Sequence, residues 1–155
     1  MKKLPKEYVI VEIIPNHSNS KVGFIVQLQA LKIKDSKIIS RLDLRVKEEL
    51  INNRDLLNMI SYDKEMFHYV DDSKILMNEF IEFIGKDKLL IIDNYYTLDY
   101  LKDIKNTKES VFKYLNMEYS EDVFDKIMKK YKLEPSNHLV DLLYEALMFE
   151  NSQMV

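Results

Sequence analysis

The sequence predicts an α/β protein: a mixed five-stranded sheet that starts with three antiparallel strands and is flanked by helices. Three observations support this. Apolar and polar side chains alternate along much of residues 8–46, as in β-strands. Residues 73–84 instead show helical spacing, and a short apolar run at 89–92 follows them. The remaining residues have helical spacing in short pieces, and this order of elements is typical of α/β or α+β proteins.

The first strand is predicted at residues 8–14, a largely β-branched run that is too short for a helix and is closed by Pro15. Glu12 lies near its end. A buried carboxylate costs several kcal/mol unless it reaches solvent, a counter-charge or a metal ion. The sequence therefore marks Glu12 as the residue that needs an explanation.

Two more strands are predicted to complete an antiparallel meander. The apolar set of the second strand is interrupted by Gln27 and Gln29. The predicted segments are a turn at 16–21, a strand at 22–33, a turn at 34–37 and a strand at 38–46.

Helices are predicted for much of the remaining chain. A weak helix covers residues 48–60, and a stronger one covers 73–84, with Asp72 or Ser73 as its N-cap and Gly85 at its end. Three shorter helices are predicted at 98–104, 108–115 and 121–131, capped by Thr97, Thr107 and Ser120. A final helix opens at Pro135 and buries Leu139, Leu142, Leu143 and Ala146.

Length and composition limit the function classes. The 155 residues fit one domain, 1–155, and 46% hydrophobic with 32% charged residues is typical of a globular chain. There is no cysteine, and three scattered histidines do not form a zinc motif, so any metal should be a hard cation held by carboxylates.

No run is long enough to span a membrane, and we expect a cytoplasmic location. The net charge of −3 makes nucleic acid a less favoured partner without excluding it.

Glu12, Asp99 and Asp141 are the candidate metal-binding carboxylates. A carboxylate at a strand end, one from a following helix start and one from a C-terminal helix can together hold Mg²⁺ for phosphodiester chemistry. Ordinary interpretations stay open: Asp99 can complement a helix dipole, and Asp141 can lie on a solvated helix face.

The sequence resembles the DEDD-type 3′–5′ exonucleases, relatives of the proofreading subunits within the ribonuclease H-like fold. Residues 8–14 stand where that family has an apolar strand ending in Asp-x-Glu. The other matching stretches are 25–33 with 35–38, then 57–61 with 63–66 (family pattern LTGIT…DEM), 80–85 with 89–101 (HNxxFDxxFL), and 135–149 (H-x-A-x-x-D-A).

The resemblance implies a damaged catalytic site. The first Asp of the family falls on Glu12, and its Glu falls on Ile14, which cannot bind a metal. Asp99 and Asp141 match the middle and last Asp. The general base falls on Ser136 or, in some relatives, on Asn137, and neither can act as a base. His138 is a possible substitute base, and His17 is a weaker one.

The implied function is a degenerate 3′–5′ exonuclease-like domain, inactive or strongly impaired, that binds nucleic acid or a protein partner. The alternative is an active exonuclease, dependent on Mg²⁺ or Mn²⁺, that acts on DNA or RNA 3′ ends through Glu12, Asp99 and Asp141. Mg²⁺ or Mn²⁺ binding is expected to be weak or absent. Tyr95 and Tyr96 lie where the substrate cleft would open, and they could stack on bases or simply pack against the core.

Overall fold

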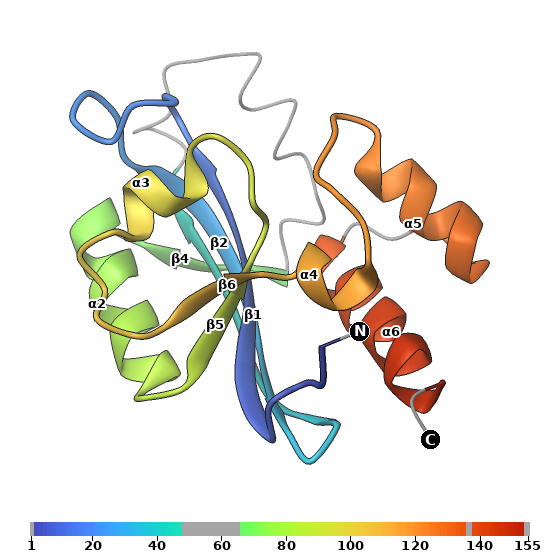
Figure 1. The fold of residues 1–155 in the computed structure, drawn as a ribbon. Helices are drawn as coiled ribbons and strands as arrows, with labels where there is room; N and C mark the ends of the chain where they lie inside the picture. Colours follow the sequence, from blue (N-terminus) through green and yellow to red (C-terminus); the bar gives the residue numbers. More distant parts are fainter. Residues whose placement is uncertain (1, 48–65, 136–137, 154–155) are drawn as a thin grey trace.

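The computed structural model describes residues 2–47, 66–135 and 138–153. They form a mixed sheet of six strands in the order β4-β3-β2-β1-β5-β6, with helices on both of its faces (Figure 1). The helix predicted at residues 48–60 lies outside the described residues.

The three N-terminal strands form the predicted antiparallel meander. They are β1 (Glu7–Pro15), β2 (Ile25–Lys34) and β3 (Lys37–Val46). Asp35 and Ser36 join β2 to β3 with φ values of 50° and 67°, the backbone conformation that suits a two-residue hairpin turn. Strand β2 begins three residues later than predicted, and Val22 is 70% exposed ahead of it.

Three short strands extend the sheet by parallel pairing. They are β4 (His68–Val70) beside β3, β5 (Lys88–Ile91) beside β1, and β6 (Lys108–Ser110) beside β5. The predicted count of five strands is therefore wrong.

Strand β6 replaces the start of the helix predicted at 108–115. The Leu89 N–H donates to the Thr107 carbonyl (2.8 Å), so Thr107 begins an edge pairing and does not cap a helix. Only α4 (Phe112–Leu115) is helical in this stretch. Residues 108–110 form a strand despite their helical spacing, because the free edge of β5 offers them backbone hydrogen-bond partners. The local sequence does not show that this edge is nearby.

The remaining described helices are α2 (Ser73–Ile84), α3 (Thr97–Leu101), α5 (Val123–Tyr131) and α6 (Leu139–Ser152). Helix α2 matches its prediction, with the Asp72 carboxylate accepting from the Ile75 N–H (2.9 Å). Helix α3 is shorter than predicted, and Thr97 lies inside it. Helix α6 begins four residues after Pro135. None of the described helices is both long and apolar enough to cross a membrane.

The sheet separates two apolar cores, because successive strand residues point to opposite faces. Val9, Val11 and Ile13 of β1 pack on the side of α2 and α3. Tyr8 and Ile10 pack on the side of α4, α5 and α6 (Figure 1). By this alternation, Glu12 belongs to the second face.

Candidate functional site

A cavity of about 230 Å³ lies at the carboxyl ends of the parallel strands β1 and β5. This is the end of an α/β sheet at which ligands commonly bind. The walls include Ile14, Tyr96, Tyr119 and Phe124, and Glu12 is the acid among the lining residues.

Glu12 is 6% exposed, and its Oε2 atom has no hydrogen-bond partner in the described chain. Burial raises the pKa of Glu12 to about 8, because water no longer stabilises the charged form. Burial therefore favours the neutral form of this side chain.

Tyr96 lines the same cavity, whereas Tyr95 lies at the surface beside it. Burial is the largest cause that raises the pKa of Tyr96 to about 12, and the nearby Glu12 adds to the effect. Tyr95 is 81% exposed and meets Tyr96 edge to face, with ring centroids 5.3 Å apart.

Asp99 lies in the first turn of α3, as predicted, but its carboxylate is bound by the loop between β1 and β2. It accepts the Ser20 N–H at 2.9 Å and pairs with Lys102 at 3.3 Å. The Ser20 backbone hydrogen bond is the main cause that lowers the pKa of Asp99 to about 2. Asp99 is not among the residues that line the cavity.

The start of α3 is held by Asn94. Its Oδ1 atom accepts from the Thr97 N–H (2.9 Å), the Thr97 hydroxyl (2.7 Å) and the Tyr96 N–H (3.2 Å). Thr97 was predicted to cap this helix, but Asn94 satisfies the free N–H groups instead.

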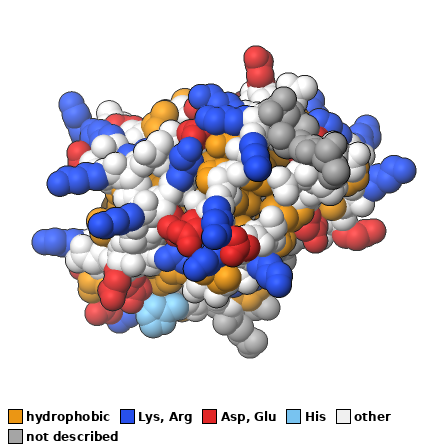
Figure 2. All heavy atoms as spheres, turned by 60° about the horizontal axis from the view of Figure 1, so that its bottom comes forward, with side chains coloured by type: hydrophobic (Ala, Val, Ile, Leu, Met, Phe, Trp, Pro, Cys, Tyr) orange, Lys and Arg blue, Asp and Glu red, His pale blue; other side chains and the backbone are white. Residues whose placement is uncertain are grey.

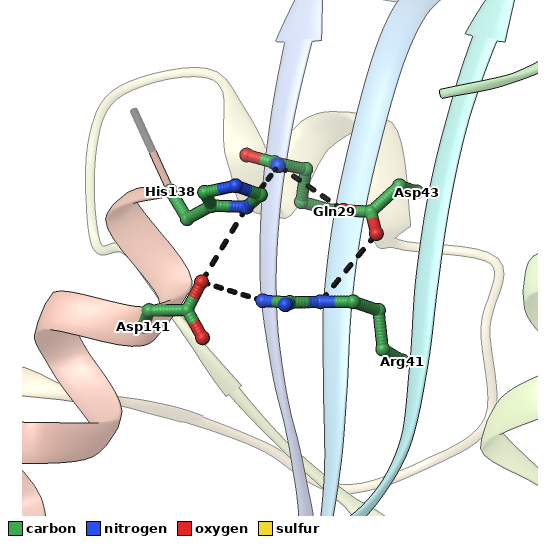
Figure 3. A network of polar contacts seen from close by, with 5 residues as sticks. All are labelled: Gln29, Arg41, Asp43, His138 and Asp141. Carbon is green, nitrogen blue, oxygen red and sulfur yellow. Dashed lines mark hydrogen bonds and ion pairs between the residues drawn. The ribbon is translucent and has the colours of Figure 1, made fainter. Parts of the chain in front are cut away.

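Asp141 belongs to a polar network of five residues between α6 and the sheet (Figure 3). Its Oδ2 atom lies 2.5 Å from Arg41 Nη2 and 3.4 Å from His138 Nδ1. Arg41 also pairs with Asp43 at 3.4 Å, and Asp43 accepts the Gln29 side-chain amide at 3.1 Å. The carboxylate of Asp141 is thus already neutralised by Arg41.

His138 faces this network. Its Nδ1 atom lies 3.3 Å from the side-chain amide nitrogen of Gln29. The same nitrogen donates a hydrogen bond to Asp43. Nδ1 also lies 3.4 Å from Asp141 Oδ2, so the tautomer of His138 decides whether this atom accepts from Gln29 or carries a proton towards Asp141. His17 lies in the β1–β2 loop, where its Nδ1 accepts the Asn19 N–H at 2.9 Å. Neither histidine lines the cavity of Glu12.

Glu12, Gln29 and Asp43 are register partners on three neighbouring strands, so they form a polar row from the cavity to the network of Asp141. In the adjacent row, Nε of the buried Arg45 donates to the side-chain oxygen Oε1 of Gln27 at 3.0 Å. The sequence pattern did not single out Arg41, Asp43 or Arg45. Gln27 and Gln29, two polar side chains inside an apolar strand, could have indicated polar partners on the neighbouring strand.

The structure does not gather the candidate metal ligands. Within residues 2–47, 66–135 and 138–153, no three His, Cys, Asp or Glu side chains form a group that could hold a metal ion. Glu12 is buried alone, Asp99 is bound to the β1–β2 loop, and Asp141 is paired with Arg41. Carboxylates arranged in this way do not fit a two-metal centre, in which they must converge on shared cations. Ser136 and Asn137 lie outside the described residues.

No protein-family model matches the sequence, and no curated protein matches it. The structure is nevertheless similar to solved structures of exonuclease I. For exonuclease I with the inhibitor BCBP, the TM-score is 0.60 at 8% sequence identity, covering 97% of this chain and 42% of that one. An ExoI/SSB-Ct complex gives 0.58 at 8% identity, covering 97% and 41%.

A zinc-bound E. coli ExoI–ssDNA complex gives a TM-score of 0.57 at 9% identity, covering 97% of this chain and 41% of that one. The chain therefore spans less than half the length of the structures it resembles. At this identity the likeness shows the fold alone, and it supports the exonuclease-like α/β fold that the sequence predicts.

Proposed function

We propose that the chain is an exonuclease-fold domain that does not hydrolyse nucleic acid and instead binds it as a single strand. One observation carries this proposal: among the described residues, the three carboxylates that would hold a metal ion do not converge on one point. Glu12 is buried in the cavity, Asp99 accepts the Ser20 N–H, and Asp141 pairs with Arg41.

The missing groups support the same conclusion. Ile14 lines the cavity where the resemblance expects a second carboxylate beside Glu12. A general base typically contributes about 10²–10⁴-fold in rate, and His138 is directed towards Gln29 and Asp141. The proposed binding therefore involves no hydrolytic step and requires neither Mg²⁺ nor Mn²⁺.

Binding of a single strand is supported by the aromatic edge of the cavity. Tyr95 is available for base stacking, which tolerates any sequence and contributes about 1–3 kcal/mol per base.

Among the described residues, the face drawn in Figure 2 has no concentrated basic patch that would indicate a second surface for nucleic-acid binding. Lysine and arginine side chains are spread around that face, with acidic side chains among them. Since the net charge is −3, we expect weak and salt-sensitive binding.

Two assays test the proposal. The purified protein is incubated with end-labelled single-stranded DNA and RNA in Mg²⁺ and in Mn²⁺, and no shortening is expected. Processive shortening that disappears in Asp99→Ala and Asp141→Ala would instead establish the active exonuclease.

Fluorescence anisotropy with short oligonucleotides then tests binding. Tyr95→Ala should weaken it by about tenfold, as expected from the loss of one stacked base. Phe149→Ala, which removes a half-exposed aromatic side chain from α6, is the matched control and should have no effect. The absence of salt-sensitive binding at low ionic strength would exclude nucleic acid as the ligand.

A further inference from the structure

The cavity beside Glu12 combines one buried acid with aromatic walls. Glu12 is 6% exposed, its Oε2 atom has no partner in the described chain, and the residue is part of the cavity lining. Tyr96, Tyr119 and Phe124 contribute to the same lining. A buried carboxyl oxygen without a partner is costly, so a cation placed beside Oε2 would offset that cost.

We propose that this cavity binds a small quaternary ammonium cation, which stabilises Glu12 in its ionised form as the counter-charge and has the three aromatic rings as cation–π partners. Aromatic cages bind quaternary ammonium groups in this way, because the negative faces of the rings attract the cation while its alkyl groups replace water.

The other polar groups of the cavity favour this ligand over a metal ion. Hard divalent cations take six or more oxygen ligands, and the described lining offers a single carboxyl group. The Asn94 side-chain oxygen already accepts three hydrogen bonds from Tyr96 and Thr97. A quaternary ammonium ion has no N–H group, so one anion balances its charge and apolar or aromatic contacts cover the rest of its surface.

The size and position of the cavity also fit a small ligand. Its volume of about 230 Å³ lies below the range of roughly 300–1,000 Å³ for sites that hold drug-sized molecules. Tyr119 is 38% exposed, so the aromatic wall reaches the surface. This inference goes beyond nucleic-acid binding, since it concerns the cavity and requires no polynucleotide.

The test compares choline with 3,3-dimethylbutan-1-ol, its neutral isostere in which carbon replaces the ammonium nitrogen. Both are titrated into the full chain by calorimetry and by NMR at one pH and one ionic strength. We expect choline to bind at least about tenfold more tightly than the alcohol. Equal affinities, or no binding of choline, would overturn the proposal.

Variants locate the site. Glu12→Gln keeps the shape of the side chain and should remove the preference for choline over the alcohol. Tyr119→Leu, at a partly exposed position, should weaken choline severalfold more than the alcohol. Asp125→Asn, which removes an exposed acid next to Phe124 in the sequence, is the control and should bind choline as the wild type does. A preference that persists in both Glu12→Gln and Tyr119→Leu would place the cation elsewhere.

Discussion

Arg41 on β3 and Asp141 in the first turn of α6 form an ion pair with an Nη2–Oδ2 distance of 2.5 Å, although they lie 100 residues apart in the chain. The pair connects the C-terminal helix to the antiparallel half of the sheet. It also occupies the carboxylate that the family resemblance assigns to a metal ion. The same contact therefore contributes to stability and supports the proposed absence of hydrolysis.

Arg41→Gln should lower the free energy of unfolding by about 1 kcal/mol. The two side chains are 40% and 28% exposed, so solvent screens the pair only in part, and Asp43 loses its contact with Arg41 as well. Urea unfolding at low salt measures the change.

The control for that change is Lys126→Gln, which breaks an ion pair with Asp122 whose side chains are 56% and 60% exposed. It should cost less than Arg41→Gln, because solvent screens this more exposed pair more strongly. A double-mutant cycle with Asp141→Asn isolates the coupling. If Arg41→Gln costs no more than Lys126→Gln, the pair does not stabilise the fold.

The stability of the folded chain should fall as the pH rises from about 4.5 to about 8. Folded Glu12 keeps its proton up to a pKa of about 8, whereas its ordinary value is 4.5. The folded state binds the extra proton throughout this window, so raising the pH favours unfolding, by up to about 1.4 kcal/mol per pH unit from this group.

Urea unfolding at pH 5.5, 6.5 and 7.5 measures that slope, and Glu12→Gln should flatten it because an amide does not titrate. Asp125→Asn, at an exposed position, should leave the slope unchanged. An identical slope in the wild type and Glu12→Gln would show that Glu12 is ionised in the folded protein.

Ile14→Glu should make the end of β1 responsive to Mn²⁺. Ile14 is 8% exposed and lines the same cavity as Glu12, so the variant places two carboxyl groups there. Without metal we expect a loss of about 3 kcal/mol, because a charged group is buried without a partner. Mn²⁺ should restore part of this loss, and thermal unfolding with and without the ion measures it.

Ile14→Gln provides the comparison, since it buries a side chain of the same size without the charge. Its melting temperature should not respond to Mn²⁺. Equal behaviour of the two variants would mean that positions 12 and 14 are not arranged as a pair for metal binding.

Gly23→Ala should destabilise the loop that holds Asp99. A Cβ atom at this position would lie 2.6 Å from each of three atoms, on Asn16, His17 and Tyr100. The Tyr100 hydroxyl donates to the His17 carbonyl at 2.5 Å, so the clash would separate α3 from the β1–β2 loop. We expect a loss of about 1–3 kcal/mol in urea unfolding.

The loss of the Ser20 hydrogen bond should also raise the pKa of Asp99 from about 2 towards its usual value, which NMR titration can follow. Gly85→Ala is the matched control. It introduces strain at a φ of 52° but meets no atom within 4 Å, so it should leave the pKa of Asp99 unchanged. An unaltered Asp99 in Gly23→Ala would show that the loop does not set its pKa.

The antiparallel half of the fold could be predicted from the sequence because its signals are local. The apolar run of β1, the alternation over β2 and β3 and the Asp72 cap of α2 depend only on nearby residues. Strands β4 and β6 could not be predicted, since each has three residues and forms by pairing with a distant strand.

The same division applies to the candidate site. The position of Glu12 near the end of a buried strand and the first-turn positions of Asp99 and Asp141 follow from the local pattern. Their partners do not. Ser20 lies 79 residues from Asp99, and Arg41 lies 100 residues from Asp141. Only the folded chain therefore shows which group binds each carboxylate.

The polar row of Glu12, Gln29 and Asp43 also sets the alignment of the strands. A one-residue slip of β2 would turn Gln27 and Gln29 towards the apolar core beneath α2, and would turn Leu28 and Ala30 out of it. Each misplaced amide would be buried without a partner, and the resulting penalty would grow with every residue moved. The polar row thus acts against mispaired forms of the hairpin during folding.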